Sequence, residues 1–195
     1  MPTNSSLGGW QDVVGHLPDL LGRPNDWLVS GSCAVALHGL AVVPKDIDVW
    51  CLPERLQQLA ERFGREIEHR TQMGFVLESF CISLDRWSVE VAGRAFMPGG
   101  IVMSVDRDML ASAGGNPLVE SVPDLLAELL TLDRSAPKAD FQRAKGLATA
   151  IGSSLDWNHV RIRMERFAVP RSRIEMQIIR LQRECQDCKV AGPER

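Results

Sequence analysis

Apolar residues recur at two periods along the front of the chain, and each period predicts a different element. Over residues 10–21 they fall three or four positions apart, which predicts an amphipathic helix. A short apolar run at 27–29 predicts a buried strand, and a compact helix is expected over 33–38. The stretch 47–52 then predicts a second strand, followed by a helix over 53–63 that begins with proline.

The middle of the chain is rich in β-strand patterns. Residues 75–84 and 87–93 flank Asp85 and Arg86, which predicts a hairpin, and residues 99–105 predict a further strand. After Ser121 the pattern becomes helical, with helices expected over 122–133, 137–151, 157–168 and 172–186. The fold class is therefore α+β. We expect a core over residues 1–120 and a helical C-terminal region over 121–195 that packs on it.

Composition narrows the class of protein. The chain has 195 residues, of which 45% are hydrophobic and 24% charged, as in an ordinary globular protein. No apolar run reaches the ~18 residues of a membrane span, and the first ten residues lack a signal-peptide pattern. The net charge of −3 shows no overall basic footprint for nucleic acid. We expect a cytoplasmic protein without a membrane partner.

The five cysteines do not form a disulfide framework. Cys33, Cys51 and Cys81 fall in apolar runs, where a free cysteine behaves as a small hydrophobic residue. Cys185 and Cys188 form a lone C-x-x-C pair, for which a zinc or redox site and an ordinary helix end are the two interpretations. Cysteines that form no disulfide framework are typical of a protein from the reducing cytoplasm.

The candidate chemistry lies in carboxylates on predicted strands. Asp46 and Asp48 are one residue apart, so their side chains share a face, and Ile47 points to the other. Paired carboxylates repel each other, and a hard cation such as magnesium removes that penalty. Glu90, which has apolar neighbours on both sides, is the preferred third ligand. Asp85 is the competitor, although aspartate is common in turns for local reasons.

Gly31 and Ser32 form a turn between a strand and a helix. Glycine allows a close approach of a ligand to the backbone, and the hydroxyl of Ser32 adds a polar contact for phosphate. Thirteen residues, 33–45, separate this turn from Asp46, which is enough for a short helix and a return to the sheet. A phosphate-binding turn beside a pair of acids suits a nucleoside triphosphate with magnesium.

This arrangement resembles the nucleotidyltransferase superfamily related to DNA polymerase beta, whose pattern is hG[GS] followed by DhD. The stretch LVSGSCAVALHGLAVVPKDIDVW is similar to minimal nucleotidyltransferases of the AbiEii toxin type and to antibiotic-modifying enzymes. The matching residues are Gly31, Ser32, Ala34, His38, Gly39, Asp46 and Asp48. Residues 121–151 resemble the helical region that follows the core in such proteins, with Lys138 and Asp140 in the pattern that faces the nucleotide.

The resemblance implies a mixed β-sheet flanked by helices and a magnesium-dependent, ATP-binding type of transferase. Asp46 and Asp48 would hold two magnesium ions, and Glu90 would complete the metal site and accept a proton. Nucleotide contacts are expected from Gly31, Ser32, Lys45 and Lys138. Lys45 stands where the family has other residues, and could supply positive charge. For the AbiEii type, the resemblance also implies an antitoxin partner.

The acceptor is left open among a small hydroxylated molecule, a tRNA end and a protein side chain. The arginines of the last two helices are either a solvated face or a groove for a polyanion. Trp157 either anchors a helix start or lines an acceptor pocket. A catalytically silent nucleotidyltransferase-like module that binds a nucleotide or a protein partner is the alternative function.

Overall fold

A computed structural model describes residues 8–22, 24–72, 74–134 and 139–190. The chain divides after Ser121 into two compact units, which are described separately. Among the described helices, none combines the length and the apolar character needed to cross a bilayer.

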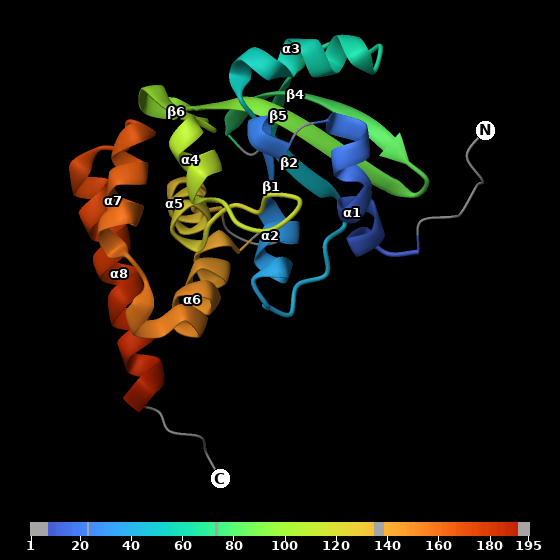
Figure 1. Cartoon of the computed structure of the whole chain (residues 1–195). Helices are drawn as coiled ribbons and strands as arrows, with labels where there is room; N and C mark the ends of the chain where they lie inside the picture. The colour runs from blue at the N-terminus through green and yellow to red at the C-terminus, as the bar shows by residue number, and fades with distance from the viewer. Residues whose placement is uncertain (1–7, 23, 73, 135–138, 191–195) are drawn as a thin grey trace. The chain divides into compact units, whose positions relative to one another are not determined.

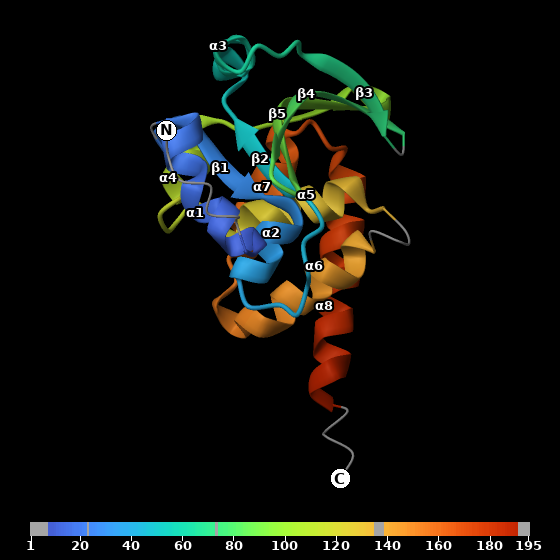
Figure 2. The ribbon, with the colours of Figure 1, turned by 90° about the vertical axis from the view of Figure 1, so that its right-hand side faces the viewer.

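The first unit is built on a mixed sheet. Its strands are β1 (Trp27–Ser30), β2 (Ile47–Cys51), β3 (Glu68–Gln72), β4 (Phe75–Leu84), β5 (Trp87–Met97) and β6 (Ile101–Ser104). The strand order is β1-β2-β5-β4-β3, with β6 paired to β5 and β3 beside β4 at one edge (Figure 2). β2 and β5 are parallel, whereas the other named pairs are antiparallel.

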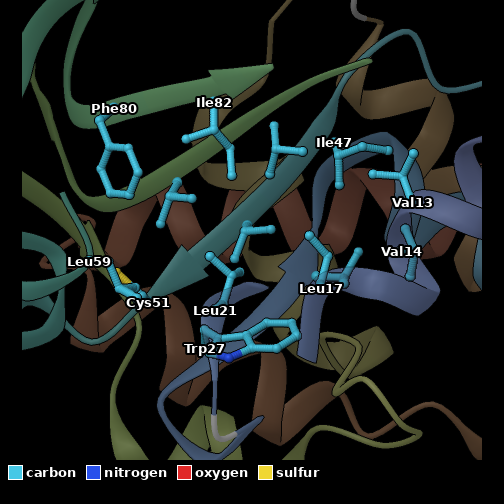
Figure 3. Close-up of a cluster of buried hydrophobic side chains, with 14 of the residues drawn as sticks. Val13, Val14, Leu17, Leu21, Trp27, Ile47, Cys51, Leu59, Phe80 and Ile82 are labelled. Carbon is cyan, nitrogen blue, oxygen red and sulfur yellow. The ribbon is translucent and has the colours of Figure 1, made fainter. Parts of the chain in front are cut away.

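One face of this sheet carries the main hydrophobic core. Helices α1 (Trp10–Leu21) and α3 (Pro53–Arg62) supply the apolar sides that their spacing predicts, and α3 packs against β5 (Figure 1). Figure 3 shows Leu17 and Leu21 of α1 gathered with Trp27, Ile47 and the other labelled side chains. Because strand side chains alternate between faces, filling this face with apolar residues leaves the polar positions of the same strands on the opposite face.

Shorter elements complete the first unit. Helix α2 (Gly31–Leu37) follows β1 directly, and α4 (Arg107–Ser112) follows β6. Single 3-10 turns lie at Pro24–Asp26 and Pro98–Gly100. The segment after α4 runs beside β1: the N–H of Val29 donates to the carbonyl of Leu118 at 2.8 Å, and the N–H of Glu120 donates to the carbonyl of Val29 at 2.9 Å.

The second unit is helical. It contains α5 (Val122–Leu132), α6 (Asp140–Ile151), a 3-10 turn at Gly152–Ser154, α7 (Trp157–Arg166) and α8 (Arg171–Val190). Helix α5 packs against α6 and α7, and α8 packs against α6 and α7 (Figure 1).

Several of the arginines that suggested a polyanion groove are used inside this unit. The Nε atom of Arg163, which is 3% exposed, donates to Oδ1 of the buried Asp124 at 2.8 Å. Arg161 pairs with Glu175 at 3.0 Å, and Arg173 donates to the carbonyl of Thr131 at 2.7 Å. The guanidinium of Arg180 lies 3.7 Å from the ring centroid of Phe141. These contacts weaken the groove interpretation.

The predicted α+β fold class, with a mixed sheet flanked by helices, is confirmed. The sequence interpretation missed β3 and α4. The sequence of β3, Glu-His-Arg-Thr-Gln, has no apolar alternation, and α4 is only six residues long. That the helical region packs on the core stays a prediction.

We expect Arg163→Ala to lower the free energy of unfolding by ~3 kcal/mol, because it leaves the buried Asp124 carboxylate without its cation. Urea unfolding followed by circular dichroism measures the loss. Arg183→Ala, at an exposed position of α8, is the control and should change stability by under ~0.5 kcal/mol. Equal effects of the two variants would contradict a structural role for the Arg163–Asp124 pair.

Candidate active site

A row of polar side chains crosses the sheet on the face opposite the main core. The register pairs Ser30 of β1 with Asp48 of β2, Asp48 with Glu90 of β5, and Glu90 with Cys81 of β4. Residues paired directly across neighbouring strands project to the same face. Two of the three predicted acids, far apart in sequence, are therefore neighbours in the sheet.

The turn after β1 touches the second acid. Gly31 has a φ of +59°, a left-handed conformation that favours glycine. A Cβ atom at Gly31 would collide with Oδ2 of Asp48 and would also meet Cγ and Cβ of the same side chain, so the Asp48 side chain or the turn would have to shift. Glycine at this position thus lets the Asp48 carboxylate lie against the backbone. The Gly-Ser turn and the acid are adjacent in space.

Cys33 lies beside both aspartates. Its Sγ is 3.5 Å from the carbonyl oxygen of Asp46, and its side chain is fully buried. Burial raises the pKa of the Cys33 thiol to about 12, and the negative charges of Asp48 and Asp46 add to the shift. The thiol therefore stays protonated and acts as a packing residue under the acids.

Glu90 already has polar partners in the structure. The hydroxyl of Ser79, a buried residue of β4, donates to Oε1 of Glu90 at 2.8 Å. The Nη1 atom of Arg70, on β3, lies 3.6 Å from the same oxygen. Both partners stand on strands that lie on the far side of β5 from Asp48.

Arg70 is itself held by its neighbours. Its Nε donates to Oε2 of Glu68 at 2.5 Å, and its Nη1 donates to Sγ of Cys81 at 3.2 Å. The hydrogen bond to Glu68 raises the pKa of Arg70. Burial, followed by the charge of Glu90, raises the pKa of the Cys81 thiol. Neither Ser79 nor Arg70 was predicted as part of the site.

At the other end of the row, Ser30 binds a buried carboxylate. Its hydroxyl donates to Oε2 of Glu120 at 2.6 Å, and both residues are fully buried. Nε2 of His38 lies 2.8 Å from the backbone carbonyl of Glu120, to which it donates. Ser30 precedes α2 and His38 follows it, so these two hydrogen bonds join Glu120 to both ends of the helix. His38 therefore has a structural partner.

The acids suit magnesium in their chemistry but are not gathered around one point. All three predicted ligands offer carboxylate oxygens, which hard divalent cations prefer. Among the described residues, no three His, Cys, Asp or Glu side chains lie close enough together to hold a metal ion. The register supplies neighbouring positions for Asp48 and Glu90, with Oδ2 of Asp48 beside Gly31 and Oε1 of Glu90 in contact with Ser79 and Arg70.

Some of the remaining predicted residues lie within the described part of the chain, and others lie outside it. Ser32 is half-buried in the first turn of α2, and Lys45 is exposed immediately before Asp46. Asp85 lies in the β4–β5 hairpin with a φ of +51°, away from the Asp48–Glu90 pairing. Lys138 lies outside the described residues, as does the side chain of Cys188. The roles predicted for all of these residues stay predictions.

The helical unit contains a separate cavity of about 280 Å³. Its lining comprises Ala148, Thr149, Gly152, Ser153, Trp157, Gln182, Cys185 and Gln186. Trp157 thus borders a cavity within the helical unit, and it also begins α7. The lining contains no charged side chain.

Comparisons with known proteins support the fold. No protein-family model matches the sequence, and no curated protein matches it either. The structure is similar to the crystal structure of a "putative nucleotidyltransferase" from Thermotoga maritima, with a TM-score of 0.50 and 18% sequence identity. The match covers 68% of this chain and 91% of that protein. The chain therefore has a nucleotidyltransferase-like fold.

We expect Gly31→Ala to destabilise the protein more than Gly64→Ala does. Gly64 has a φ of +61°, almost equal to that of Gly31, but a Cβ there would meet nothing within 4 Å. The control variant therefore measures backbone strain alone, about 1 kcal/mol. Gly31→Ala adds the collision with Asp48 and should cost at least ~2 kcal/mol more. Urea unfolding of both variants tests this, and equal losses would contradict the contact.

Proposed function

We propose that this chain is a nucleotidyltransferase that moves a nucleoside monophosphate from a nucleoside triphosphate to an acceptor hydroxyl and releases pyrophosphate. The observation that carries the proposal is the pairing of Asp48 with Glu90 on adjacent strands, with Gly31 pressed against the Asp48 carboxylate. A glycine turn and acids side by side suit a triphosphate escorted by a divalent cation. The nucleotidyltransferase-like fold supports the same reaction class.

Asp46, Asp48 and Glu90 would hold two magnesium ions. When bound, the ions neutralise the triphosphate charge and polarise the acceptor hydroxyl. Oxygen-only ligands agree with this choice of cation. Asp46 and Asp48 are both partly exposed, so they are accessible from solvent.

The chain's other contributions are binding and positioning. Gly31 brings the backbone of this turn against the Asp48 carboxylate, and the Ser32 hydroxyl beside it would donate to a phosphate oxygen. The exposed ammonium of Lys45, next to Asp46, would meet the negative charge of the triphosphate. Lys138 is proposed to contact the nucleotide by resemblance alone.

In the transfer step, the acceptor oxygen forms a bond to the α-phosphorus, and the bond from that phosphorus to the bridging oxygen breaks. Pyrophosphate leaves with the electron pair of the broken bond. The proton of the acceptor hydroxyl passes to the carboxylate of Glu90. Positioning and charge neutralisation supply most of the rate enhancement in this class of reaction.

A small hydroxylated molecule is the acceptor class that these observations favour. The internal contacts of Arg161, Arg163 and Arg173 remove much of the support for a tRNA groove. The AbiEii-type assignment, with an antitoxin as partner, and the antibiotic-modifying assignment are both kept as proposals from the sequence resemblance. A protein hydroxyl is the remaining acceptor class.

A second candidate function is a catalytically silent module that binds a nucleotide or a protein partner. The observation in its favour is that Glu90 is occupied by Ser79 and Arg70 and that the described acids are not gathered as metal ligands. Such a module would shift its melting temperature with a nucleotide but would release no pyrophosphate with any acceptor.

We expect Asp48→Asn to lower pyrophosphate release at least ~100-fold, because it removes a carboxylate from the metal site while keeping its shape. The assay uses the full chain with magnesium, each nucleoside triphosphate in turn, and a panel of hydroxylated small molecules, tRNA and protein acceptors. Pyrophosphate is measured by a coupled phosphate assay.

Asp85→Asn is the matched control, since it removes one carboxylate from the hairpin turn. It should retain the wild-type rate. Activity that survives Asp48→Asn would contradict the proposed metal site. Nucleotide binding without turnover by the wild-type protein would favour the silent module.

A further inference from the structure

The cavity of about 280 Å³ is formed wholly by residues of the helical unit. Its wall is drawn from α6, the turn that follows it, the start of α7 and the second half of α8. Tertiary packing of three helices therefore creates it, and no single segment of the chain does. Pockets for small molecules begin at about 300 Å³, so the size suits a small ligand with one or two rings.

The cavity has a sheltered part and an open rim. Ala148 is buried, and Trp157 and Gln182 are half-buried. Thr149 and Ser153 are exposed, so the cavity reaches the surface and a ligand can enter from solvent. A ligand that passes the rim would contact side chains that are partly shielded from water.

The charge of the wall selects the class of ligand. None of the described residues that line the cavity is charged. Lys145, one helical turn before Thr149, is engaged with Glu184 in an ion pair of 2.7 Å. The wall thus offers no counter-charge to a phosphate, a carboxylate or an ammonium group, which would lose hydration on entering. We therefore expect a neutral ligand.

The wall does offer an indole ring and uncharged hydrogen-bonding groups. Gln182 and Gln186 each carry an amide that can both donate and accept. Among the described residues, none is hydrogen-bonded to either of these amides or to the indole N–H of Trp157. By contrast, the hydroxyl of Thr149 donates to Sγ of Cys185 at 3.7 Å. An aromatic ring with two available amides suits a flat ring that has donors and acceptors along its edge.

We propose that this cavity binds a neutral nucleoside, with the base against the indole of Trp157 and the base edge towards the amides of Gln182 and Gln186. A nucleobase is flat and uncharged, and its edge carries both donors and acceptors. The inference goes beyond the proposed function and does not rest on it, because no phosphate, metal ion or transfer step enters it.

The direct test is isothermal titration calorimetry of the full chain with adenosine, guanosine, cytidine and uridine. EDTA is present, so that no divalent cation loads the proposed site at Asp48. We expect at least one nucleoside to bind, with one molecule per chain. Trp157→Leu should raise its dissociation constant at least about tenfold by removing base stacking. Gln182→Ala should raise it about fivefold by removing one hydrogen bond.

Gln142→Ala is the matched control, since Gln142 is an exposed glutamine of α6 outside the lining. It should bind the nucleoside as the wild type does. The 5′-monophosphate of the same nucleoside should bind no more tightly than the nucleoside, because the wall has no cation. Circular dichroism establishes that each variant is folded. If Trp157→Leu fails to fold, Gln182→Ala against Gln142→Ala carries the comparison.

The thiol of Cys185 reports where the nucleoside binds. Cys185 is half-buried in the wall, so a saturating nucleoside should slow its alkylation by N-ethylmaleimide several-fold. Cys81, half-buried on β4, is the control and should react at an unchanged rate. Tandem mass spectrometry assigns the modified residue in each sample.

Binding that Trp157→Leu and Gln182→Ala weaken, together with protection of Cys185, supports the proposal. Absence of nucleoside binding overturns it, as does binding that neither variant weakens. Methyl glucoside, titrated in the same way, tests a sugar as the ligand, and binding of this compound without any nucleoside also overturns the proposal. None of these results bears on pyrophosphate release, so the proposed function stands or falls separately.

Discussion

The parallel pairing of β2 with β5 is the constraint on which the candidate site depends. It sets Asp48 beside Glu90, although about forty residues separate them, and the antiparallel neighbours extend the row to Ser30 and Cys81. A shift of the register by one residue would turn the carboxylates into the hydrophobic core. Burial of Val49, Val89 and other apolar residues on the opposite face therefore also determines where the acids point.

The two carboxylates of this row have different neighbours in the protein. Asp48 rests against the backbone at Gly31, and Glu90 is held by a hydroxyl and a guanidinium. In the helical unit, the buried Asp124 likewise has polar neighbours, because it accepts from both His159 and Arg163. The donors to Glu90 in the first unit and to Asp124 in the second lower the cost of taking these two carboxylates out of water.

Much of the fold followed from apolar spacing. The helix at 10–21 and the hairpin at 75–97 have strong periodic patterns, and both are present. β3 was missed because its edge position demands no apolar face, so its sequence carries no alternation. Of the site, the proximity of Gly31 to Asp48 could be expected from a strand–helix–strand connection. Ser79 had a detectable signal in the polar alternation of β4, whereas Arg70 had none.

The sequence by itself determined which residue types were present for the chemistry: a glycine turn, an aspartate and a glutamate on strands whose other face is apolar, and a second aspartate immediately before one of these strands. That information is local, because side-chain alternation follows from the backbone of a single strand. Only the tertiary structure decided that Glu90 stands next to Asp48 and that its carboxylate turns to Ser79 and Arg70. Strand order and register depend on long-range packing, so no local pattern could specify those partners.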